Sequence, residues 1–155
     1  MRTAKLDDER GIALAVSLFC LVVVGAIVAG NFFAARLEQQ SGQNMFFVAE
    51  ASEAAEAGVS DALATLSSAA FESLPVGGEP LLLSPISLGP GVSSAPDISR
   101  LTATLFLIRA RGTRANAAGD ALASRGVGAL VQVAGATSSE PARLLVIERG
   151  WFQLY

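Results

Sequence analysis

The sequence contains no histidine and only one cysteine, Cys20. Without histidine there is no Ser-His or Cys-His pair to activate a nucleophile, and Cys20 lies in an apolar run rather than at an accessible thiolate site. A single cysteine cannot form an intramolecular disulfide. Beyond the leader, the acidic residues of the predicted helix occur singly and do not converge with other metal ligands. These absences predict a protein that is not an enzyme, holds no metal or cofactor and takes no small-molecule substrate.

Charge is missing from the stretch Gly11–Ala35, which directly follows the charged leader MRTAKLDDER. A cleaved secretory signal has an apolar core of about 7 to 15 residues, and this stretch is longer. A run of about 20 apolar residues spans a bilayer as a helix, because a helix satisfies its backbone hydrogen bonds internally. We therefore expect a membrane anchor. Val28 and Gly30 are small enough for signal peptidase, which would leave a chain starting near Asn31.

Basic residues flank this stretch unevenly. Arg2, Lys5 and Arg10 precede it, whereas Arg36 alone follows closely. The positive-inside rule then places the N-terminus in the cytoplasm and the rest of the chain outside.

Proline is absent between Arg36 and Ala70, where alanine and other good helix formers are frequent. Helical spacing puts one set of residues on a single face, and Glu50, Glu53, Glu56 and Asp61 on the other side. The apolar set comprises Val48, Ser52, Ala55, Val59, Ala62, Leu63 and Leu66. The pattern predicts one helix that is apolar all round over 12–35 and amphipathic over 36–70, with Gly25, Gly30, Gly42 and Gly58 as weak points.

Glycine and proline then punctuate residues 75–97, PVGGEPLLLSPISLGPGVSSAPD, which predicts a loop region with one short strand at Leu81–Leu83. Three further strands are predicted. They are Leu101–Arg111, Val127–Ala134 and Arg143–Glu148, the last followed by a bulge or turn at Arg149 and Gly150. Short strands in this order form a small antiparallel sheet, whose only large apolar partner is the amphipathic part of the helix. The predicted fold class is α+β.

Two stretches resemble the type IV pilin and pseudopilin superfamily. RGIALAVSLFCLVVV, residues 10–24, is similar to the start of PilX-like minor pilins, and FFVAEASEAAEAGVSDALATL, residues 46–66, is similar to their Ala- and Glu-rich helix. The resemblance covers about the first 70 residues. It implies a pilin-like fold with a leader (1–11), a transmembrane and filament-core helix (12–35), its amphipathic continuation (36–70) and a region of loops and sheet (71–155).

The resemblance also implies a sequence of events. A prepilin peptidase cuts between Gly11 and Ile12 on the cytoplasmic side, and the new N-terminus is methylated. The released helix then leaves the lipid of the bacterial inner membrane, with the help of an assembly platform there, and joins other pilin or pseudopilin subunits in an extracytoplasmic filament. The implied filament-core residues are Leu14, Val16, Leu18, Leu21, Val24 and Ile27.

Val16 departs from the family pattern. Most major pilins carry a glutamate as the fifth mature residue, where it pairs with the N-terminal amine of a neighbour. Val16 occupies that position here, and Gly11–Ala35 contains no carboxylate. This departure favours a minor subunit that primes or joins assembly of a type IV pilus or type II secretion pseudopilus, at the tip or in the shaft.

Charge is distributed unevenly beyond the anchor. Residues 36–99 contain eight acidic residues and one arginine, whereas residues 100–155 contain seven arginines and three acidic residues. One interpretation is that the sheet of one subunit contacts the acidic helix of another, with Glu50, Glu53, Glu56, Arg109 and Arg111 as contact charges; the other is two ordinary solvated faces. The chain is acidic overall and lacks interleaved aromatics, so we do not expect it to bind nucleic acid.

Two other functions remain open. One is a single-pass membrane protein whose outer domain acts as a scaffold or sensor without polymerising. The other is a domain secreted after conventional signal cleavage. The N-terminal residue of the mature chain distinguishes the three: Ile12, Met1 or a residue near Asn31.

Overall fold

The computed structural model describes residues 4–65, 73–134 and 143–154, and the chain divides into two units, residues 1–43 and 44–155. The fold is α+β, with one long N-terminal helix and an antiparallel sheet. The elements are α1 (Ala4–Thr65), β1 (Leu81–Leu82), β2 (Ile86–Gly89), β3 (Val92–Arg100), β4 (Leu105–Ala115), β5 (Ala121–Ala134) and β6 (Arg143–Leu154). The predicted fold class is confirmed at this level.

Helix α1 is unbroken as far as Thr65. It begins at Ala4, ahead of the expected start at Ile12, because the leader has no proline and includes good helix formers such as Lys5, Leu6 and Arg10. The helix continues through all four glycines that were expected to weaken it. Its predicted last turn, residues 66–70, lies outside the described residues.

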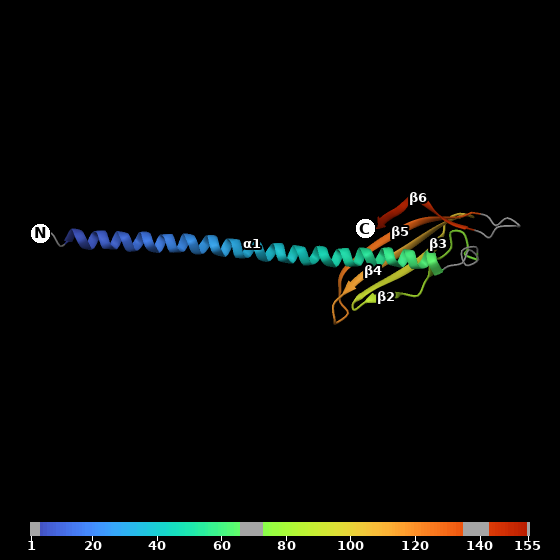
Figure 1. The fold of residues 1–155 in the computed structure, drawn as a ribbon, viewed down its shortest axis with the longest axis horizontal. Coiled ribbons are helices and arrows are strands. Elements are labelled where there is room, and N and C mark those ends of the chain that lie inside the picture. Colours follow the sequence, from blue (N-terminus) through green and yellow to red (C-terminus); the bar gives the residue numbers. More distant parts are fainter. Residues whose placement is uncertain (1–3, 66–72, 135–142, 155) are drawn as a thin grey trace. The chain divides into compact units, whose positions relative to one another are not determined.

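The sheet is a meander in which β3, β4, β5 and β6 lie side by side in chain order (Figure 1). The outer edge of β3 is shared by two short strands. Strand β1 pairs with its C-terminal half, where Leu81 lies opposite Ile98, and β2 pairs with its N-terminal half, where Ile86 lies opposite Ser94. All pairings are antiparallel.

The prediction of a loop over 75–97 was wrong beyond the short strand at Leu81, because β2 and most of β3 lie in this range. Pro96 was the misleading residue, since proline cannot donate a hydrogen bond to a sheet. It pairs with Ala110 of β4, and on its other side it lies between the ends of β1 and β2. At this position Pro96 needs only to accept a hydrogen bond, and the Leu83 N–H donates one to the Pro96 carbonyl at 3.0 Å.

Strand β4 is displaced from the predicted range 101–111. The residues before it form a turn in which the N–H groups of Leu101 and Thr102 donate to the Leu105 carbonyl at 2.9 and 3.1 Å. At the other end the strand continues through Gly112 to Ala115. Strand β5 correspondingly starts at Ala121, six residues before the predicted start at Val127.

The bulge or turn predicted near Arg149 and Gly150 is confirmed as an irregularity of β6. Val131 of β5 pairs with Val146, but the preceding pair joins Ala129 to Trp151. The residues between Val146 and Trp151 therefore form an insertion opposite Leu130, and the strand resumes pairing beyond it.

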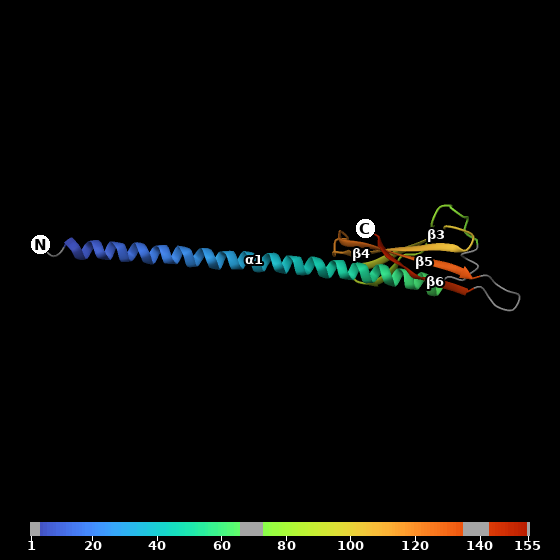
Figure 2. The ribbon, with the colours of Figure 1, turned by 90° about the horizontal axis from the view of Figure 1, so that it is seen from above.

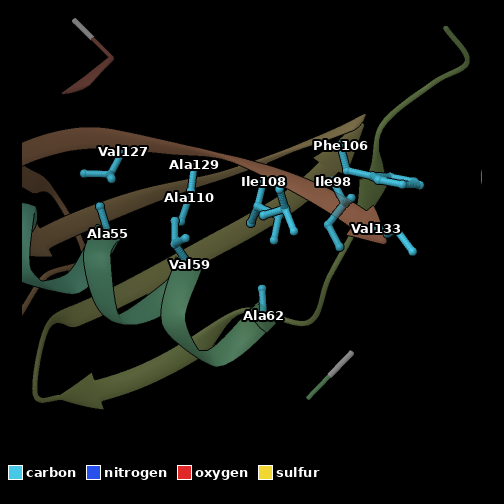
Figure 3. Close-up of a cluster of buried hydrophobic side chains, with 11 residues drawn as sticks. Ala55, Val59, Ala62, Ile98, Phe106, Ile108, Ala110, Val127, Ala129 and Val133 are labelled. Atoms are coloured by element: carbon cyan, nitrogen blue, oxygen red, sulfur yellow. The ribbon is translucent and has the colours of Figure 1, made fainter. Parts of the chain in front are cut away.

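The core lies between the C-terminal part of α1 and one face of the sheet, as predicted, and Figures 1 and 2 show this part of the helix along the sheet. Figure 3 shows Ala55, Val59 and Ala62 of the helix directed towards the strands. Their buried partners are Ile98, Phe106, Ile108, Ala110, Val127, Ala129, Val131 and Val133. Alternate strand residues supply this core, since successive side chains of a strand point to opposite faces.

Candidate functional surfaces

The N-terminal unit carries an apolar helical surface. Ile12, Val16 and Leu21 are all exposed, the last by 73% of its surface, and no charged residue interrupts the run before Arg36. The other expected filament-core residues, Leu14, Leu18, Val24 and Ile27, are exposed too. The segment is long and apolar enough to cross a membrane. Exposed apolar surfaces of this extent are typical of segments that contact lipid or protein.

The expected processing junction lies within α1. Ile12 is 62% exposed, and the helix continues from the leader through Gly11 into the apolar segment. A peptidase acting at this bond would therefore have to unwind about one turn of helix, because backbone in a helix is hydrogen-bonded internally.

Glu50 is an intramolecular partner of Arg114. The Glu50 Oε2 and Arg114 Nε atoms are 3.1 Å apart, and three quarters of each side chain is buried. Arg114 Nη1 also donates to the Pro90 carbonyl at 2.7 Å, and the guanidinium lies 6.0 Å from the centre of the Phe47 ring. Arg114 therefore fastens α1 to the sheet, and Glu50 belongs to this internal contact.

Arg109 is also paired within the chain. Its Nε and Nη2 atoms both donate to Asp97 Oδ1, at 2.9 and 2.7 Å, across the β3–β4 pair. Arg111, two residues further along the same face of β4, is exposed and has no ion pair within the described residues. Of the two arginines expected to form subunit contacts, only Arg111 is thus unpaired in this part of the chain.

Glu53 and Glu56 lie on the exposed side of α1. Neither forms an ion pair in the ranges that the structure describes. Glu53 lines a hollow of about 330 Å³ together with Glu50, Ala54, Ala57, Leu88 and Val92. Glu56 does not line this hollow.

Small residues of α1 make the contact with the sheet. The predicted apolar face of the helix, which included Val48, Ser52 and Leu63, only partly coincides with the buried one. The buried helix face is Ala51, Ala54, Ala55, Gly58, Val59 and Ala62, centred on alanines and glycine. A Cβ atom at Gly112 would collide with the Ala51 carbonyl and come within 2.5 Å of the Ala55 nitrogen. Gly112 therefore lets the helix backbone lie directly on β4. The spacing of Ala51, Ala55, Gly58 and Ala62 was the available sequence signal for this face.

Two aromatic residues lie on the unpaired edge of the sheet. Trp151 and Phe152 of β6 are both partly exposed, whereas Tyr155 lies outside the described residues. Among the residues that the structure describes, no group of three acidic, histidine or cysteine side chains could hold a metal ion.

Comparison of the chain with protein-family models, with curated proteins and with solved structures finds no match to any of them.

Proposed function

We propose that this chain is a minor pilin or pseudopilin, a structural subunit that primes or joins assembly of a type IV pilus or a type II secretion pseudopilus. One observation carries the proposal. A single helix presents exposed apolar side chains from Ile12 onwards, and its C-terminal part packs on an antiparallel sheet. This combination supports a segment that is first a membrane anchor and later the core of a filament.

The charged leader gives the proposal a physical mechanism. Moving charged side chains into an apolar helical bundle is costly. Cleavage between Gly11 and Ile12 removes Asp7, Asp8, Glu9 and Arg10 and leaves an apolar end. The trimmed helix can then exchange lipid for neighbouring helices, while the sheet unit remains outside the membrane.

Val16 restricts the position of the subunit in this scheme. A neighbour's N-terminal amine would find no carboxylate in the segment that starts at Ile12, and an unpaired buried charge is destabilising. The proposed subunit therefore primes or caps an assembly, or is inserted into it sparsely.

A second candidate, a single-pass scaffold or sensor that does not polymerise, rests on the same exposed helix. The two functions predict different fates of the bond after Gly11. When the chain is co-expressed with a prepilin peptidase, the pilin proposal predicts loss of the leader from the wild type and its retention in Gly11→Trp. Gly25→Trp, a matched change inside the apolar segment, should still be cut. Equal masses of the wild type and Gly11→Trp, both with the leader attached, would support the scaffold; cutting of Gly11→Trp at the same bond would also contradict the pilin proposal.

A further inference from the structure

Internal ion pairs reduce the charges that are available for other molecules. Glu50 is paired with Arg114 and Arg109 with Asp97, whereas Glu53 and Arg111 have no ion pair within the described residues. These two residues lie on different surfaces of the same unit.

The acidic surface is the hollow beside α1 that contains Glu53. Two carboxylates, Glu50 and Glu53, line it, and Leu88 and Val92 form an apolar side. Arg114 compensates only Glu50, so Glu53 contributes a negative charge that no ion pair among the described residues neutralises. Leu88 is 47% exposed there. The hollow therefore suits a cation that has an apolar stem or apolar neighbours.

The basic surface lies on the sheet face opposite α1, around Arg111. This arginine borders two adjacent hollows. One, of about 350 Å³, also contains the Asp97–Arg109 pair, Arg125, Ser124 and Leu154, and the other, of about 450 Å³, also contains Asp97, Leu82 and Pro85. Leu82 is 78% exposed. Arg111 thus combines a charge that has no ion pair within the described residues with an apolar neighbour, Leu82, and a second basic one, Arg125.

The two surfaces lie at the same level along the helix. Gly112 packs against Ala51 and Ala55 of α1, and Arg111 is the residue before it on the opposite face of β4. Glu53 lies in that same turn of the helix. Two copies standing side by side with parallel helices therefore bring Arg111 of one to Glu53 of the next without a shift along the helix axis.

We infer that Arg111 of one copy binds the Glu50–Glu53 hollow of a second copy. Each copy carries both halves of the contact, so the association is head-to-tail. A single surface ion pair contributes at most about 1 kcal/mol. Its effect is to select orientation and register between copies that a membrane already concentrates. The inference rests on the membrane-anchored arrangement of the proposed function, but it requires neither cleavage after Gly11 nor a filament.

The contact can be tested by reversing the charges of its two residues and measuring cross-linking between full-length copies in lipid vesicles, without any peptidase. In a Cys20→Ala background, one copy carries Ser60→Cys near the acidic hollow and the other carries Ser124→Cys beside Arg111, and a flexible bismaleimide joins them. E53R in the first copy or R111E in the second should each lower the yield of the linked pair about tenfold, because like charges repel. E53Q should lower it less. Combining E53R with R111E should restore the yield.

E56R is the matched control, since Glu56 lies one turn from Glu53 on the exposed helix but outside the hollow; it should leave the yield unchanged. Trp151 fluorescence during unfolding verifies that each variant is folded. Equal losses with E53R and E56R, or no recovery when E53R meets R111E, would overturn the inference. A lower yield with R111E but not with E53R would also overturn it, since Arg111 would then bind a different anionic group. Because no peptidase is present, these outcomes are independent of the Gly11 test.

Discussion

The two parts of helix α1 are both rich in apolar residues, but they use different ones. Between Ile12 and Phe33 the apolar side chains include many large ones, such as Leu, Val, Ile and Phe, and all are exposed. Between Ala51 and Ala62 the buried face consists of alanine, glycine and one valine. The difference shows that apolar content alone does not identify the folded core. The size of the apolar side chains separates the part of the helix that packs on its own sheet from the part whose apolar side chains are exposed.

Small residues serve the second part because they bring the helix backbone close to the strands. Gly58 faces Ser94 and Ala110, and Gly112 faces the backbone of Ala51 and Ala55. Close backbone approach lets a thin layer of side chains fill the interior at high density. The larger contributors, notably Phe106 and Ile108, come from the sheet.

The largest effect should come from a pair of phenylalanine truncations, one in each region. Phe106→Ala removes a fully buried ring and should lower the free energy of unfolding of the sheet unit by about 4 kcal/mol. Phe33→Ala removes an exposed ring and should leave that free energy unchanged. Denaturant titration of the full chain in detergent micelles, followed by Trp151 fluorescence, measures both. Equal losses would contradict the distinction between the two regions.

A pair of helix glycines should give the next largest difference. In Gly58→Val the new Cβ would collide with Ser94 Oγ and lie 3.0 Å from the Ala110 Cβ, so we expect a loss of about 2 kcal/mol through overpacking. In Gly42→Val the new Cβ lies within 4 Å of no other atom, so this variant should change the denaturant concentration at the unfolding midpoint little. If the two variants unfolded at the same denaturant concentration, helix and sheet would not be in close contact at Gly58.

Removing the contacts that Arg114 makes with Glu50 and Pro90 should have a smaller effect. Arg114→Met keeps an unbranched apolar stem but removes the ion pair to Glu50 and the hydrogen bond to Pro90, so stability should fall by about 1 kcal/mol. The difference in unfolding free energy between the wild type and Arg114→Met should shrink as salt concentration rises, because salt screens a partly exposed ion pair. A loss that was the same at all salt concentrations would assign the role of Arg114 to packing alone.

The smallest predicted effect has the opposite sign. Ser94 is buried, and its hydroxyl has no hydrogen-bond partner within the described residues. Ser94→Ala removes this uncompensated polar group and should raise the free energy of unfolding by about 0.5 kcal/mol. The shift in the denaturation midpoint measures it, and a clear decrease would show that the hydroxyl is hydrogen-bonded in solution.

Regular patterns allowed part of this fold to be predicted from the sequence. The alanine-rich, proline-free run predicted α1, and the β-branched and aromatic runs predicted strands at β4, β5 and β6. Strand β3 was missed because Pro96 and the surrounding serines are typical of loops. Its place in the sheet depends on β4, which pairs along its whole length, and such tertiary context does not appear in a local window.

The candidate contact residues illustrate the same limit. Sequence alone selected five charges on two complementary regions: Glu50, Glu53, Glu56, Arg109 and Arg111. It could not show that Glu50 and Arg109 are paired inside the chain, because their partners Arg114 and Asp97 are brought to them only by the fold. Pairing distinguishes an internal charge from an available one, and this requires the structure.

The most direct test of the proposed function is the N-terminal residue of the chain in its own cell, determined by peptide mass both in the membrane fraction and in material sheared from the cell surface. The proposal predicts a chain beginning at Ile12, with a methylated amine, in both fractions. A chain that keeps the leader through Gly11 and occurs only in the membrane would contradict it.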